Sequence, residues 1–140
     1  VERDKKFVMK VIKQILDGKK EIFAIDEIIG SPTYAKELIY TISQLIKTDL
    51  WGTYHCTNNG RMSRYDVAKV ICEKIDPAIK VMPVKSDYFN LPALRAISEY
   101  SENRMLTLRG LNALSSTEDA VRAYMEEIRK SGFLDAIIKS

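Results

Sequence analysis

Two hydrophobic periods alternate along this chain, and this alternation constrains its fold more than any other feature. Apolar residues recur at helical spacing over residues 7–16, and the stripe ends at Asp17-Gly18, which is a helix-stop signal. The next apolar stretch, EIFAID at 21–26, is short and β-favouring, so it predicts a strand. Because helix-like and strand-like segments continue to alternate, the sequence predicts an α/β fold.

The rest of the chain follows the same pattern. Helices are predicted over 30–47, 63–75 and 115–132, a short helical stretch near 102–108, and strands over 52–58 and 79–84. In the second helix, Ser31 is expected to be the N-cap, with Pro32 in the first turn. Its buried face is predicted to consist of Ala35, Leu38, Ile39, Ile42, Leu45 and Ile46. About three strands are too few for a convincing independent sheet.

Composition narrows the function classes. The chain has 140 residues, 46% hydrophobic and 29% charged, which is a globular balance for one domain or part of one. Its net charge of +3 comes from Lys and Arg scattered among acids, so no nucleic-acid partner is expected. No apolar run approaches the ~20 residues of a membrane span. Because the chain opens on Val1, without a secretory signal, we expect it to be cut from a longer protein.

Cys56, Cys72 and His55 are the residues that raise the question of a metal site. The two cysteines have no CxxC spacing, and a single histidine does not complete a zinc site with them. Both cysteines lie among apolar residues and are expected to behave as small core side chains. We therefore predict no metal and a reducing, cytoplasmic compartment.

The stretch SRYDVAK, residues 63–69, has the Tyr-x-x-x-Lys spacing that short-chain dehydrogenases use at their catalytic centre. However, Ser63 and Asp66 have N-cap and N3 spacing, which places Tyr65 in the first turn of its helix. The apolar stripe of that helix turns Lys69 outward. No Gly-rich loop precedes the motif to hold a dinucleotide. We predict that neither residue is catalytic.

Several motifs, taken in order, resemble a known family. They are Phe7-Val8, Gly30-Ser31-Pro32-Thr33, Gly52-Thr53-Tyr54-His55, residues 63–68 and Pro92-Ala93-Leu94-Arg95. The series resembles the C-terminal half of dTDP-4-dehydrorhamnose reductases, which are extended short-chain dehydrogenases that act on nucleotide sugars. The chain departs from the family pattern at Glu27-Ile28, Arg64, Val67 and Ala96.

This resemblance implies that residues 1–140 form the C-terminal substrate-binding region, with late elements of the Rossmann domain. The N-terminal nucleotide-binding sheet and the catalytic Tyr-Lys pair would then lie outside the chain. The parent would reduce dTDP-4-dehydro-L-rhamnose to dTDP-L-rhamnose with NADPH or NADH, in dTDP-rhamnose and polysaccharide biosynthesis. Expected partners are the dTDP-sugar and the missing Rossmann half, while homo-oligomerisation is left open. The chain alone is expected to bind no cofactor and to be inactive.

The resemblance also names substrate-binding residues. Arg95 is the first candidate, because a guanidinium fork suits two pyrophosphate oxygens; its alternative role is to hold an irregular loop. Ser31 and Thr33 would lie near the sugar pocket, although helix capping is favoured for both. His55 is expected to be packed and hydrogen-bonded. No catalytic or cofactor-binding residue is predicted.

Two alternatives belong to other functional classes. The first is a non-catalytic regulatory or scaffold protein on the same fold, as in the regulatory β subunit of methionine adenosyltransferase. The second is an independent small module that binds a partner through its helices. A Gly-rich loop and a true Tyr-x-x-x-Lys in the preceding sequence would favour the reductase.

Overall fold

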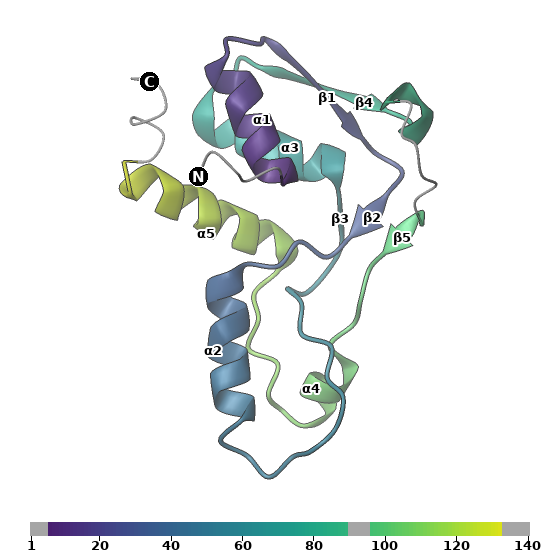
Figure 1. Ribbon diagram of the computed structural model, residues 1–140, viewed down its shortest axis with the longest axis vertical. Helices are drawn as coiled ribbons and strands as arrows, with labels where there is room; N and C mark the ends of the chain where they lie inside the picture. Colours follow the sequence, from purple (N-terminus) through teal and green to yellow (C-terminus); the bar gives the residue numbers. More distant parts are fainter. Residues whose placement is uncertain (1–5, 90–95, 133–140) are drawn as a thin grey trace.

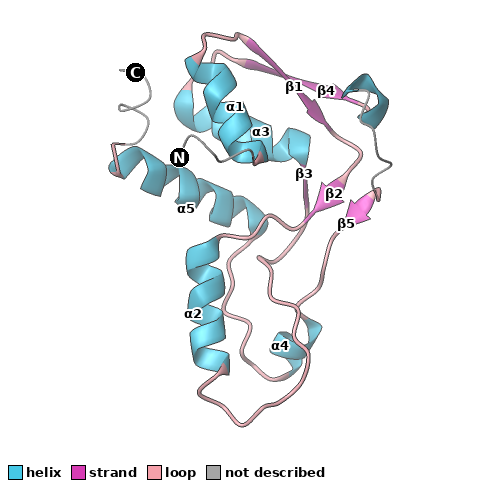
Figure 2. Cartoon of the chain, viewed as in Figure 1, coloured by secondary structure: helices cyan, strands magenta, loops and turns pink. Residues whose placement is uncertain are grey.

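The computed structural model of the chain describes residues 6–89 and 96–132. Five α-helices, five strands and one 3-10 helix follow one another as shown in Figure 1. They are α1 (Phe7–Leu16), β1 (Glu21–Ile25), β2 (Ile29–Gly30), α2 (Ala35–Leu45), β3 (Met62–Ser63), α3 (Arg64–Ile75), β4 (Lys80–Val84), η1 (Ser86–Phe89), β5 (Ser98–Glu99), α4 (Arg104–Leu108) and α5 (Thr117–Lys130). The mixture of helices and short strands confirms the predicted α/β class (Figure 2).

The larger part of the molecule is built around α3. Strands β1 and β4 run parallel, in register from Glu21↔Lys80 to Ile25↔Val84. Helix α3 contacts both strands, and it also packs against α1 and α5 (Figure 1). Parallel strands are joined by long connections that carry helices, and here α2 and α3 lie between the two strands in sequence.

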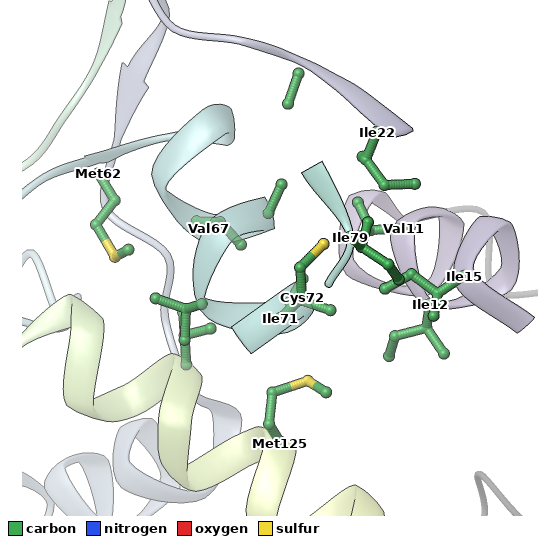
Figure 3. Close-up of a cluster of buried hydrophobic side chains, with 14 of the residues drawn as sticks. Val11, Ile12, Ile15, Ile22, Met62, Val67, Ile71, Cys72, Ile79 and Met125 are labelled. Atoms are coloured by element: carbon green, nitrogen blue, oxygen red, sulfur yellow. The ribbon is translucent and has the colours of Figure 1, made fainter. Parts of the chain in front are cut away.

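One apolar cluster fills this part of the molecule (Figure 3). Ile12, Ile22, Ala68 and Ile71 are fully buried in it, and Met125 reaches it from α5. At about 25 cal/mol per Å² of apolar surface removed from water, this cluster dominates the stability of the fold. The stripe predicted for α1 supplies three of its members, Val11, Ile12 and Ile15.

A small sheet of order β3-β2-β5 joins this part to a second one. Strand β2 is antiparallel to β3 and parallel to β5, and each strand has two residues. We use "α2 lobe" for residues 31–61 and 100–116, which lie on the other side of this sheet and contain α2 and α4 (Figure 1). No member of the apolar cluster comes from the described residues of this lobe. Its buried residues are Thr41, Asn58, Asn103, Leu106 and Leu114.

Most predicted helices and two predicted strands are confirmed. Helices α1, α3, α4 and α5 and strands β1 and β4 lie within or close to the expected ranges. Ser63 and Asp66 form the expected capping box of α3, and Ser116 caps α5. Among the described residues, no helix is long and apolar enough to span a membrane.

Three predictions about the α2 lobe are wrong. Residues 52–58 form no strand, because no strand in the described part of the chain pairs with them. Helix α2 begins at Ala35 with Tyr34 as its N-cap, so Ser31 does not cap it. Its predicted buried face is also wrong, since Thr41 is the one fully buried residue of the helix, whereas Ile39 and Ile46 are 66% and 75% exposed.

Candidate functional site

The loop between β2 and α2 is held by Ser31. The hydroxyl of Ser31 donates to the carbonyl oxygen of Gly60 at 3.3 Å and accepts from the backbone N–H of Ser101 at 3.4 Å. One side chain thereby connects three segments that are distant in sequence. Its hydrogen-bond capacity serves the loop itself rather than the start of α2.

Thr33 occupies a different position in this loop. It is exposed, and its hydroxyl donates to the carbonyl oxygen of Ser31 at 3.0 Å. The start of α2 has no side-chain cap, so the capping role expected for Ser31 and Thr33 is wrong. The helix is instead fixed by Asn58, whose Oδ1 accepts from the backbone N–H of Tyr34 at 2.9 Å.

A pocket of about 390 Å³ opens beside this loop. It is lined by the loop, by the first turns of α1 and α3, and by Glu99 of β5. Lys6 and Arg64 contribute two cationic groups to the lining, against the one carboxylate of Glu99. A pocket of mixed apolar walls and excess positive charge suits a ligand with both a ring system and phosphate groups.

Arg64 is a pocket residue that sequence reasoning missed. It appears in the sequence only as a departure from the family pattern, at the first position of α3. Its guanidinium carbon lies 5.4 Å from the centroid of the Phe7 ring, a cation–π distance that orients the side chain. The signal that could have identified it is its place directly after the Ser63 cap, next to the loop of Ser31.

Arg95 lies outside the described residues. Two described residues that follow it shortly afterwards pair with β2. The backbone N–H of Ile29 donates to the carbonyl oxygen of Ile97 at 2.9 Å, and Ser98 pairs with Ile29 across β2 and β5. The segment that follows Arg95 therefore runs beside the strand that leads into the Ser31 loop.

A second pocket, of about 330 Å³, lies against a network of asparagine side chains. Asn103, which is 6% exposed, accepts from the backbone N–H of Thr57 at 2.9 Å and donates to Asn59 Oδ1 at 3.2 Å. Asn112 donates to the same Asn59 oxygen at 2.8 Å. The sequence did not single out Asn103 or Asn112 as candidates, because their partners lie more than forty positions away.

The predicted placements of Tyr65 and Lys69 are confirmed. Tyr65 is in the first turn of α3, and Lys69 is exposed. The ammonium of Lys69 lies 5.4 Å from the centroid of the Tyr65 ring, so the i, i+4 spacing supports a cation–π contact. This contact gives the motif a structural explanation.

His55 and the cysteines differ from one another in environment. His55 is exposed, so the expectation of a packed histidine is wrong. Cys72 is fully buried as predicted, and desolvation raises the pKa of its thiol to about 11. Cys56 is half-buried, and burial raises its pKa as well. The described part of the chain contains no cluster of side chains that could hold a metal ion.

Glu27, where the chain departs from the family pattern, has a structural role. Its carboxylate accepts from the backbone N–H of Ser86 at 2.7 Å and from the Ser86 hydroxyl, at the start of η1. These hydrogen bonds lower the pKa of Glu27, and Lys85 adds to the effect. The residue faces η1, so its carboxylate is already used within the fold.

A comparison with known protein families tests the resemblance that the motifs indicate. A family model described as the RmlD substrate binding domain matches residues 1–130. The chain belongs to the RmlD substrate-binding domain family. The resemblance noted in the sequence is thereby confirmed.

Curated relatives of this RmlD-family chain are bacterial. It is 29% identical over 133 residues to the dTDP-4-dehydrorhamnose reductase of Mycobacterium tuberculosis (strain H37Rv), covering 93% of this chain and 43% of the relative. It is 27% identical over 121 residues to the spore coat polysaccharide biosynthesis protein SpsK of Bacillus subtilis, covering 86% of this chain and 42% of the relative.

Solved structures of reductases share the fold of the RmlD-family chain. The dTDP-4-dehydrorhamnose reductase of Bacillus anthracis in complex with NADP matches with a TM-score of 0.78 and 32% identity, over 90% of this chain and 44% of that one. The Clostridium acetobutylicum orthologue matches with a TM-score of 0.82 and 25% identity, over 91% and 45%. The chain thus spans less than half the length of the relatives it matches.

Proposed function

We propose that this chain is the substrate-binding part of a reductase that converts dTDP-4-dehydro-L-rhamnose to dTDP-L-rhamnose. The observation that carries the proposal is the match to the substrate-binding family over residues 1–130, together with an open, cation-lined pocket beside the Ser31 loop. Relatives named as dTDP-4-dehydrorhamnose reductases support the choice of substrate.

In this function the chain binds and orients the sugar nucleotide. Thr33, exposed beside the pocket, would contact the sugar, and Ser31 would hold the loop in place through Gly60 and Ser101. Arg95 would neutralise the pyrophosphate with a two-pronged hydrogen bond. We add Arg64 as a second pyrophosphate candidate, because it lines the same pocket. Holding the reacting carbon in one geometry is the main contribution that such a part makes to the rate.

NADPH would supply the hydride, and we assign no residue of this chain to it. The NADP complex of the Bacillus anthracis relative supports that choice of cofactor. We propose that the nucleotide-binding residues and the proton donor lie in a further part of the protein, so the 140-residue chain alone reduces nothing. The two free cysteines fit a cytoplasmic setting.

Calorimetric titration of the chain with dTDP and with NADPH tests this function. We expect dTDP to bind and Arg95→Ala to weaken the binding at least tenfold. Thr33→Ala should weaken it less, because Ser31 still keeps the loop in place. Arg129→Ala, an exposed arginine on α5, is the matched control and should leave the affinity unchanged. Tight binding of NADPH by the chain would overturn the proposal. So would a dTDP affinity that neither Arg95→Ala nor Arg64→Ala lowers.

A further inference from the structure

Three short strands place Glu99 in a row with Gly30 and Met62. In the β3-β2-β5 sheet, Gly30 pairs with Met62 on one side and with Glu99 on the other (Figure 1). Residues that lie directly opposite each other in neighbouring strands project to the same face of a sheet. Met62 and Glu99 therefore border the same face, and all three residues of the row line the pocket of about 390 Å³ beside the Ser31 loop.

The middle of this row is open because residue 30 is a glycine. A Cβ atom placed on Gly30 would lie 3.9 Å from the Cβ of Glu99, so a longer side chain here would occupy the space next to the carboxylate. Gly30 does not have a positive φ, so its backbone conformation does not require a glycine. A glycine inside a strand is often found where a ligand comes close to the backbone. At this position its effect is to keep the pocket open.

The carboxylate of Glu99 is free to bind a ligand. It is exposed, and it forms no hydrogen bond or ion pair with any residue in 6–89 or 96–132. The carboxylates of Glu27 and Glu37, in contrast, accept hydrogen bonds within the fold. Among the described residues that line this pocket, Glu99 is the one carboxylate, and its acceptor oxygens are unused.

The cations of the pocket lie on the other side of β2. Arg64 directly follows β3, and its guanidinium contacts the ring of Phe7, the neighbour of Lys6. Strands β3 and β5 are two strand spacings apart, which is roughly 10 Å. The pocket therefore has a positive end at Arg64 and a negative end at Glu99.

A sugar nucleotide fits these two ends in one direction. Its phosphates are attracted to the guanidinium and repelled by the carboxylate, so they lie at the positive end. Hydroxyl groups of a sugar ring can donate hydrogen bonds to an ionised carboxylate, and such bonds are stronger than those between neutral groups. Two neighbouring hydroxyls match the two acceptor oxygens of one carboxylate.

We propose that Glu99 recognises a vicinal diol, that is, two neighbouring hydroxyl groups of a sugar ring, and thereby determines which sugar nucleotides the pocket accepts. This inference rests on the proposed function, because it takes the phosphates of the ligand to lie near Arg64. Two rings of a sugar nucleotide can supply the diol. One is the hexose, as in dTDP-L-rhamnose. The other is a ribose, as in UDP, whereas the deoxyribose of dTDP has no vicinal diol.

Calorimetric titration of the chain and of Glu99→Gln with dTDP, dTDP-L-rhamnose and UDP tests the proposal. Glutamine keeps the shape of the side chain and removes the charge that strengthens the hydrogen bonds. If the hexose supplies the diol, dTDP-L-rhamnose binds at least tenfold more tightly than dTDP, and Glu99→Gln abolishes this advantage. If a ribose supplies it, UDP has the advantage over dTDP and loses it in the variant. In both cases the affinity for dTDP changes less than twofold.

Glu102→Gln is the matched control. Glu102 is exposed, lies three residues further along the chain and does not line this pocket, so its substitution should leave all three affinities unchanged. The assignment of Glu99 is overturned if neither diol-bearing ligand binds more tightly than dTDP, or if Glu99→Gln affects the three ligands equally or not at all. Binding of dTDP in such a result leaves the proposed function in place. A chain that binds none of the three ligands overturns both.

Discussion

Glu37 and Ser115 are 78 residues apart in sequence, and Glu37 Oε2 accepts a hydrogen bond from the backbone N–H of Ser115 at 2.9 Å. The same oxygen accepts from Asn58 Nδ2 at 2.7 Å. The carboxylate therefore joins α2 to two loops of its lobe, in a region with little apolar core. Hydrogen bonds to a charged group are among the stronger ones in proteins, at about 1.5–3 kcal/mol each.

Glu37→Ala should consequently lower the free energy of unfolding by about 2–3 kcal/mol, because the backbone N–H of half-buried Ser115 and the side-chain amide of buried Asn58 lose their charged acceptor. Urea unfolding followed by circular dichroism measures the change. Glu126→Ala removes an exposed ion pair with Lys74 in another helix and should change stability far less. Equal losses in the two variants would contradict the role assigned to Glu37.

Thr41 offers a prediction of opposite sign. Its hydroxyl is buried and has no hydrogen-bond partner among the described residues. Thr41→Val keeps the shape and removes the unpaired hydroxyl, so we expect it to raise the unfolding free energy by about 1 kcal/mol. Thr41→Ser retains the hydroxyl and should not stabilise. A destabilised valine variant would show that the hydroxyl is in fact paired in solution.

Ser63 and Asp66 form two reciprocal capping hydrogen bonds at the start of α3. Its hydroxyl accepts from the backbone N–H of Asp66 at 3.0 Å, and the Asp66 carboxylate accepts from the backbone N–H of Ser63 at 2.9 Å. Ser63→Ala should cost about 1 kcal/mol of unfolding free energy. Ser63→Asp retains a capping acceptor but places a second carboxylate beside Asp66, so it should recover only part of the loss. Thermal unfolding of the three proteins tests this order.

The burial of the Cys72 thiol makes the stability of the fold depend on pH. Burial raises the pKa of this thiol from 9.0 to about 11, so the folded protein keeps a proton that the unfolded chain loses. The unfolded state binds fewer protons between about pH 9 and 11, and stability must fall as pH rises through this window. The stability difference between the natural protein and Cys72→Ala should shrink from pH 8 to pH 11. A constant difference would contradict the prediction.

Local signals explain which parts of the fold could be predicted. Helices α1, α3 and α5 carry a cap or stop signal and an apolar stripe within one stretch of sequence, and all three form as expected. The two-residue strands β2, β3 and β5 were not predicted, since each exists only through pairing with a distant segment. Residues 52–58 have strand-forming side chains but no partner strand among the described residues, so their composition alone was misleading.

The orientation of α2 illustrates a second limit of sequence reasoning. Periodicity correctly locates the apolar stripe that contains Ile39, Ile42 and Ile46, but it does not say which surface covers it. The prediction places the stripe in the core, because the sequence of one chain shows no other surface that could cover it. In the site, the asparagine network was not predicted, because its members act through contacts between distant segments.

The pairing of β2 with β3 brings Gly30 directly opposite Met62. Residues 31–61 therefore leave the sheet and return to it at neighbouring positions, within one strand spacing of about 5 Å. Insertions, deletions or replacements inside this excursion need not shift the register of the apolar cluster on the other side of the sheet. The length of the segment that carries Ser31 and Thr33 is thus independent of the register of that cluster.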